Sequence, residues 1–142
     1  MKMNYLLLVS LLSFVLFSCN GSTEKEQAME MLQASLEEIN EDIPQQVDEV
    51  TTWLGCTLEE PYFVYNYSIS GKDLEEDPID ILYENSDAFR ENLAKSIKND
   101  VFVGETQNIL IKAGYGIRYH YTATTSTYSI DFDFTPEQIA EM

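Results

Sequence analysis

The chain has 142 residues, of which 25 are acidic and 8 are basic, so its formal net charge at pH 7 is −17. This length suits one domain with a substantial hydrophobic core. So negative a chain repels nucleic acid and anionic lipid head groups, which excludes both as ligands. The charge keeps the domain soluble and monomeric, and it favours either a basic partner or a plain solvated acidic surface.

The first eighteen residues have the layout of a secretory signal. Lys2 is the only charge before Cys19, and the stretch Tyr5–Phe17 is apolar except for two serines. A membrane span needs about 20 apolar residues, so this run is too short to be one. Residues 1–18 are therefore predicted to be a signal peptide that is removed on export.

The run ends in Leu16-Phe17-Ser18-Cys19. This resembles the lipobox of bacterial lipoproteins, with Phe17 in place of the usual smaller residue. The resemblance implies cleavage before Cys19 and a thioether between its thiol and diacylglycerol. Fatty acyl chains such as palmitate, two or three together, then hold the protein at a membrane. The predicted organisation is a signal peptide (1–18), a lipidated tether (19–22) and one α+β domain (23–142).

The residues after the cysteine bear on location. Lipoproteins of an inner membrane often carry Asp after the cysteine, so Asn20 resembles the outer-membrane class. The polar, acid-rich stretch at 21–26 resembles the signal that sends lipoproteins of Bacteroides-like bacteria to the cell surface. We predict a lipid anchor in the cell outer membrane, and both the periplasmic side and the cell surface remain open.

The mature chain opens with a predicted amphipathic helix at 24–42, which Thr23 caps and Pro44 stops. Apolar residues then alternate from Val47 to Leu58 and from Phe63 to Ile69, which predicts a β-hairpin. Alternation puts Cys56 on one face with Leu54 and Leu58, and Trp53 on the other.

The middle of the chain is predicted to be helical after an acidic loop at 71–78. A helical pattern runs over 79–99 with a possible interruption at Asn85-Ser86. Residues 105–113 are predicted to form a further helix, although the run Ile109–Ile111 leaves a strand open.

Two further alternating stretches, Tyr115–Thr124 and Tyr128–Phe134, predict a second hairpin, and Thr135-Pro136-Glu137 starts a short helical turn. The predicted fold is therefore α+β, with an antiparallel sheet of two hairpins and helices packed on one face.

The mature part also resembles, weakly, a group of small uncharacterised exported bacterial proteins. The shared segments are Val47-Asp48-Glu49-Val50-Thr51-Thr52, Val64-Tyr65-Asn66-Tyr67 and Phe134-Thr135-Pro136. They support the fold prediction and carry no catalytic motif.

The residue types that could do chemistry are few. Cys56 and His120 are the only Cys and His after Cys19, and alternation sends them to opposite faces of the sheet, which disfavours a thiol–imidazole dyad. Because Cys19 is used for the lipid, no intrachain disulfide is expected. Asp131 and Asp133 form a carboxylate pair on one strand face, which favours a solvated surface over acid–base work.

Ligand and surface predictions follow from the same patterns. One His and one inward Cys cannot make a zinc site, and the carboxylates of loop 73–77 lack the spacing of a calcium loop, so we predict no metal and no cofactor. Trp53 and Tyr62, on the outward side of the first hairpin, are the possible binding surface. The alternative is that Trp53 packs under the first helix and Cys56 faces outward.

These observations predict a non-enzymatic, lipid-anchored binding or structural protein, with no catalytic residues and with a protein partner of basic character. Three alternatives remain: an immunity-like inhibitor of a basic toxin, a carboxylate-dependent hydrolase, and a small-ligand carrier with a pocket between sheet and helices.

Overall fold

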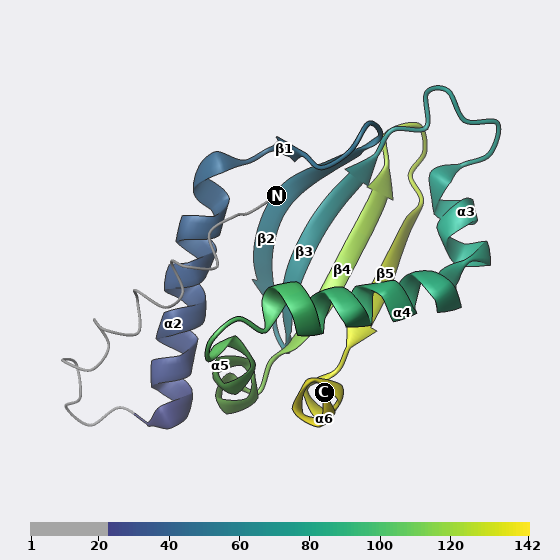
Figure 1. Ribbon diagram of the computed structural model, residues 1–142. Coiled ribbons are helices and arrows are strands. Elements are labelled where there is room, and N and C mark those ends of the chain that lie inside the picture. Colours follow the sequence, from purple (N-terminus) through teal and green to yellow (C-terminus); the bar gives the residue numbers. More distant parts are fainter. Residues whose placement is uncertain (1–22) are drawn as a thin grey trace.

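The computed structural model describes residues 23–142, so the predicted signal peptide, Cys19 and the tether lie outside the described residues. Figure 1 shows one sheet with helices on one side of it. The helical elements are α2 (Glu24–Ile39), the 3-10 turn η1 (Asn40–Asp42), α3 (Pro78–Glu84), α4 (Ser86–Ser96), the π-helical turn η2 (Ile97–Val101), α5 (Thr106–Ala113) and α6 (Pro136–Glu141). The strands are β1 (Gln45–Gln46), β2 (Thr51–Glu59), β3 (Tyr62–Ile69), β4 (Gly116–Ala123) and β5 (Ser129–Phe134).

The helix boundaries follow local chemistry. The Thr23 hydroxyl accepts a hydrogen bond from the Glu26 N–H at 3.2 Å and caps α2 as predicted. The Asp77 carboxylate accepts one from the Ile79 N–H at 2.9 Å and caps α3. The predicted interruption at Asn85 separates α3 from α4. Residues 106–113 are helical, so the strand alternative for Ile109–Ile111 is wrong.

The sheet has the order β1-β2-β3-β4-β5, and the α+β class is confirmed. Both predicted hairpins are present, since β2 pairs with β3 and β4 with β5 in antiparallel register. The prediction that the whole sheet is antiparallel is wrong, because β3 and β4 are parallel. The helical segment between them returns the chain to the end of the sheet where β3 began, and a parallel pair requires such a crossover. The strand β1 is an additional, short edge strand.

A β-bulge in β2 overturns the predicted alternation of the first hairpin. Trp53 lies opposite Tyr67 and Cys56 opposite Tyr65, so Leu54 is an extra residue in the register. Gly55 has φ +107°, a conformation that favours glycine. As a result Trp53 and Cys56 face the same side of the sheet, which neither sequence-based alternative predicted.

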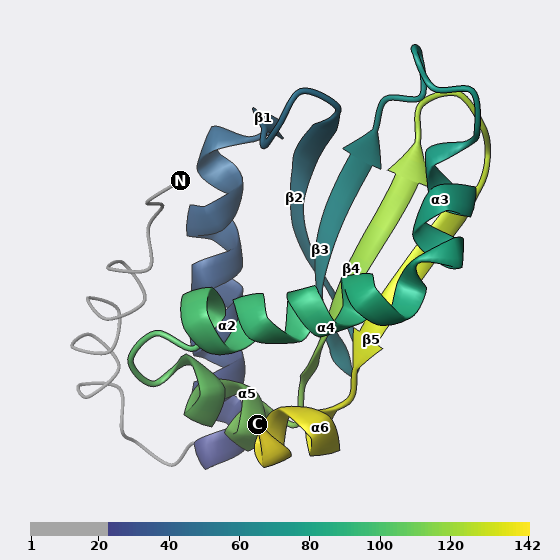
Figure 2. The same cartoon turned by 45° about the vertical axis from the view of Figure 1, so that its right-hand side comes forward.

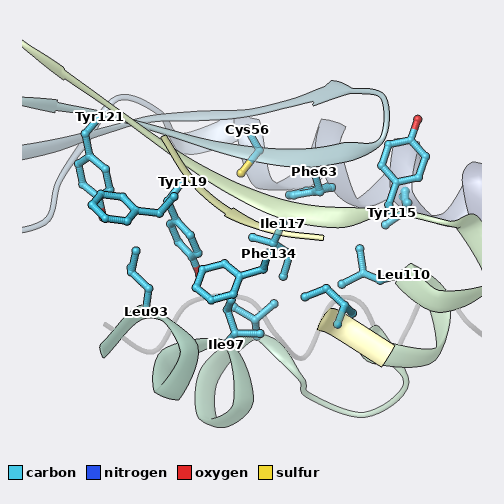
Figure 3. Packing of buried hydrophobic residues seen from close by; sticks show 14 of the residues in the cluster. Cys56, Phe63, Leu93, Ile97, Leu110, Tyr115, Ile117, Tyr119, Tyr121 and Phe134 are labelled. Carbon is cyan, nitrogen blue, oxygen red and sulfur yellow. The ribbon is translucent and has the colours of Figure 1, made fainter. Parts of the chain in front are cut away.

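The core lies between that side of the sheet and the helices. Figure 3 shows Ile117, Phe134 and Tyr119 of the sheet directed towards Leu93 and Ile97 of the helical layer. Figure 2 shows the helices on the same side of the sheet, as predicted, from a second direction. All the helices and strands listed above lie within residues 23–142, so a chain that starts at residue 20 keeps the whole core. Among these described residues, no helix has both the length and the apolar character that a membrane span requires.

Candidate ligand-binding groove

An apolar groove of about 720 Å³ lies between the sheet and the helices. This volume falls within the range of about 300–1,000 Å³ that is typical of small-molecule and cofactor sites. The groove is lined by residues of α2, β2, β3, α3, α4, η2, α5 and β4, and of the loops before β2 and after β3. We refer to it below as the groove.

Stacked tyrosines line the groove on the sheet side. The parallel register places Tyr65 beside Tyr119 and Tyr67 beside Tyr121. The ring centroids of these two pairs are 5.1 Å and 5.0 Å apart, with interplanar angles of 16° and 14°. Phe89 of α4 packs edge-on against Tyr121 at 5.4 Å. The rings therefore form a continuous aromatic surface, which stabilises a flat, largely apolar wall.

The groove is closed at one end and open at the other. At the closed end, Leu110 and Ile117 are 2% and 1% exposed. At the open end, Val47, Val50 and Leu74 are 37%, 43% and 42% exposed, although all three line the groove. They belong to the loops before β2 and after β3, which Figure 1 shows at the end of the sheet away from α5 and α6. These three side chains form the groove mouth.

The charges along the groove all have one sign. Its lining contains the carboxylates Glu38, Asp48 and Asp100, and no described Lys, Arg or His lines it. Asp48 Oδ1 accepts hydrogen bonds from the N–H groups of Val50 at 2.9 Å and Thr51 at 2.8 Å. These bonds, the one from Val50 above all, lower the pKa of Asp48, so its carboxylate is ionised and held in a fixed position.

Trp53 lies inside the groove, on the inward side that one of the two sequence-based alternatives gave it, and not on an outward binding surface. It is 8% exposed and lines the groove. Its indole N–H has no hydrogen-bond acceptor among the described residues apart from the nearby thiol of Cys56, a weak acceptor. Burial raises the pKa of the Cys56 thiol well above its usual range, and the indole N–H opposes that shift only in part.

Tyr62 lies on the opposite face of the sheet, so Trp53 and Tyr62 do not form one surface. Tyr62 is on the outer face, where the guanidinium carbon of Arg118 is 4.5 Å from its ring centroid. Arg118 also donates two hydrogen bonds to Asp133, at 2.7 and 2.8 Å. The Asp133 hydrogen bond is the main reason that the pKa of Arg118 is raised.

The predicted polar residues of the second hairpin lie on this outer face too. His120 Nδ1 is 2.6 Å from Asp131 Oδ1, and Arg118 approaches Asp131 at 3.9 Å. Asp131 and Asp133 are therefore engaged with Arg118 and His120 on a face that does not line the groove. Cys56 lies on the core side, so the predicted separation of Cys56 from His120 is confirmed.

No metal-binding group stands out in the part of the chain that the structure describes. Within residues 23–142, no three His, Cys, Asp or Glu side chains come together as a possible ligand set. In the acidic loop, Asp77 is engaged as the cap of α3.

The sequence did not single out the carboxylates of the groove or its tyrosine wall. Alternating tyrosines in β3 and β4 were visible, but their stacking depends on the parallel register between these strands. Asp48 looked like one acidic residue among many, because only the fold brings it to the groove.

Comparisons with known proteins give structural likeness alone. The sequence matches no known protein family and no curated protein. A Pseudomonas aeruginosa protein that has been assigned as secreted has a similar fold, with a TM-score of 0.64 and 16% identity over 84% of this chain and 99% of that chain. The pilotin EpsS of the Vibrio vulnificus type 2 secretion system is also similar, with a TM-score of 0.56 and 11% identity over 82% of this chain and 94% of that chain. The protein therefore has an α+β fold that is also found in a secretion-system pilotin and in a protein assigned as secreted.

Proposed function

We propose that this protein is an exported lipoprotein, anchored through Cys19, whose domain is a binding module that holds the apolar part of a partner in the groove. The observation that carries the proposal is the groove mouth, where three large apolar side chains that line a 720 Å³ groove remain exposed. Exposed apolar surface costs about 25 cal/mol per Å², so a partner that covered it would gain that free energy.

The lipid anchor rests on the residues that precede the domain. Leu16, Ser18 and Cys19 fit a lipobox, and the first described helix begins at Glu24, only five positions after the cysteine. The likeness of the fold to a protein assigned as secreted and to a secretion-system pilotin agrees with an envelope location. The outer membrane is the proposed site, on the periplasmic side or the cell surface.

A non-enzymatic role is part of the proposal. The described lining of the groove contains no Cys, His or Lys, and its ionisable residues are three carboxylates and four tyrosines. The carboxylate pair that a hydrolase would need, Asp131 and Asp133, lies on the outer face and is engaged with Arg118 and His120. These placements favour binding over catalysis.

The groove is tested with the chain of residues 20–142 and the neutral dye N-phenyl-1-naphthylamine, whose fluorescence rises in apolar sites. We expect saturable binding that Leu74→Glu weakens, because this change puts a charge at the groove mouth. Leu54→Glu is the matched control, since Leu54 is 45% exposed, like Leu74, but does not line the groove. Equal binding by both variants, or no binding by the unmodified chain, would reject the groove as a site.

The anchor is tested separately in the full-length protein. Cys19→Ala should abolish lipid labelling and move the protein out of the detergent phase, because the substitution removes the thiol that accepts diacylglycerol. Unchanged membrane fractionation of that variant would show that the anchor assignment is wrong, whatever the dye shows about the groove.

A further inference from the structure

We infer that the groove is built for a positively charged, amphipathic α-helical segment of a partner protein. This inference rests on the proposed function and names the class of ligand. It commits to a peptide and not to a lipid, and the reasons are the charge, rigidity and direction of the groove.

Charge separates the two classes. The lining combines a mostly apolar surface with three carboxylates and, among described residues, no cation. The chain that follows the predicted signal peptide has 25 acidic and 7 basic residues, a net charge of −18, so the surrounding field has the same sign. Fatty acids and the anionic head groups of envelope lipids would be repelled at this mouth, whereas Lys and Arg side chains would be attracted.

Asp48 is the residue best suited to recognise such a cation. It lies next to the mouth between Val47 and Val50, and its two backbone hydrogen bonds fix Oδ1 in place. A fixed carboxylate loses little conformational entropy when it pairs with a cation. Its lowered pKa keeps it ionised at neutral pH.

The shape suits an added helix. Residues of α2, α3 and α4 line the groove, and the stacked tyrosines of β3 and β4 line its sheet side. Figure 1 shows α2 and α3 near opposite edges of the sheet. A helix with its side chains is about 10 Å across and can place an apolar stripe on the rings while its polar face stays in water. Lys or Arg at the edge of that stripe would then lie beside Asp48, Glu38 or Asp100.

The direction of the groove agrees with a partner that arrives from the aqueous side. The α2 helix begins at Glu24 and lies beside α5, at the closed end of the groove, and its 16 residues extend about 24 Å towards the mouth. The four Cα–Cα steps from Cys19 to the cap residue Thr23 can span at most about 14 Å. If Cys19 is lipidated, this reach would keep the bilayer nearer to the closed end of the groove than to its mouth.

The test uses the chain of residues 20–142 and Trp53, which is the only tryptophan and lines the groove. A 14-residue amphipathic Leu/Lys peptide without aromatic residues should change Trp53 fluorescence saturably. Two matched peptides should bind at least about tenfold more weakly: one with Glu in place of Lys, and one with the same composition in an order that has no apolar face.

Variants identify the carboxylates. The triple change Glu38→Gln, Asp48→Asn and Asp100→Asn keeps side-chain size and should weaken binding of the Leu/Lys peptide about tenfold at low salt. The control triple Glu30→Gln, Glu37→Gln and Glu59→Gln removes the same charge from positions outside the groove and should change binding less than about twofold. Raising the salt concentration should reduce the difference in peptide affinity between the two triple variants.

The outcomes separate this inference from the proposed function. Binding of the neutral dye together with equal affinity for the Lys and Glu peptides, or with tighter binding of palmitate than of the Leu/Lys peptide, overturns the cationic-helix inference alone. Failure of every apolar probe to bind overturns both. If the two triple variants weaken binding of the Leu/Lys peptide equally, the affinity depends only on the net charge of the domain. That result also overturns the role of the groove carboxylates.

Discussion

Asp48 and Tyr121 line the same groove, and the charge of Asp48 adds to burial in raising the pKa of the Tyr121 hydroxyl. The two residues are 73 positions apart in a chain whose acidic residues otherwise look interchangeable. Their proximity joins an ionised carboxylate to the aromatic wall of the groove. This combination of charge and apolar surface is the basis of the binding role proposed above.

The first prediction concerns Gly55, the glycine of the bulge in β2. Gly55→Ala should lower the free energy of unfolding by about 3 kcal/mol, since a Cβ would overlap the side chains of Ile43 and Asn40 and φ is +107°. Urea unfolding of the 20–142 chain measures this. Gly114→Ala is the control, because its φ is +72° but nothing lies within 4 Å of its added Cβ, so only about 1 kcal/mol should be lost. If the two variants lost the same unfolding free energy, the bulge at Gly55 would not be tightly packed.

A second prediction concerns Asn40, which follows α2. Its amide donates to the Cys56 carbonyl at 2.9 Å and accepts from the Cys56 N–H at 2.8 Å, so one side chain pairs with both backbone groups beside the bulge. Asn40→Ala should cost about 2–3 kcal/mol in urea unfolding, because both groups lose partners. Asn99→Ala, at an exposed position, should cost less than about 0.5 kcal/mol. A loss of unfolding free energy as small as that of Asn99→Ala would show that water readily replaces the two hydrogen bonds of the Asn40 side chain.

The third prediction is a pH dependence at Asp48. Its pKa is lowered in the folded state, so the stability it contributes is present above its unfolded pKa, near 3.8, and is lost as pH falls through the folded value. Asp48→Asn can keep the acceptor oxygen but not the charge. The variant should be less stable than the unmodified chain at pH 7, and the gap should narrow below about pH 4. The urea midpoints of both chains at pH 7 and pH 3 measure this stability difference. A difference that does not change with pH would show that an ionised Asp48 does not stabilise the turn.

Cys56 gives a fourth prediction. Burial raises its pKa, so the thiol of the folded 20–142 chain should react with 5,5′-dithiobis(2-nitrobenzoate) far more slowly than a free cysteine at pH 8. Addition of urea above the unfolding midpoint should restore one fast-reacting thiol per chain. Rapid reaction without urea would mean that β2 opens readily or that the thiol faces solvent.

The periodicity of the sequence was sufficient for the elements but not for their arrangement. Helices capped by Thr23 and Asp77, and two hairpins with alternating residues, follow from local chemistry and were predicted. The parallel pairing of β3 with β4 depends on where the helical segment between them returns the chain, and no local pattern encodes that direction. The prediction of an antiparallel sheet is therefore wrong for the pair β3 and β4, which joins the two hairpins.

The bulge in β2 decides which side chains reach the groove, and the sequence-based prediction did not include it. Because of one extra residue, Leu54, Trp53 and Cys56 lie on the same face, whereas both sequence-based alternatives put them on opposite faces. Gly55 was the available signal, since a glycine inside a strand pattern often marks a bulge. The outer-face residues Tyr62, His120 and Asp131 were placed correctly because no bulge interrupts β3, β4 or β5.

The most direct test is a two-dimensional ¹⁵N–¹H NMR titration of the 20–142 chain with the Leu/Lys peptide. The single indole N–H of Trp53 reports on the groove, and the amides of His120 and Asp131 report on the outer face. We expect the peptide to change the chemical shifts of the Trp53 indole N–H and of the Val50 and Tyr67 amides. The amide shifts of His120 and Asp131 should change little. Shifts confined to the outer face, with Trp53 unmoved, would contradict binding in the groove.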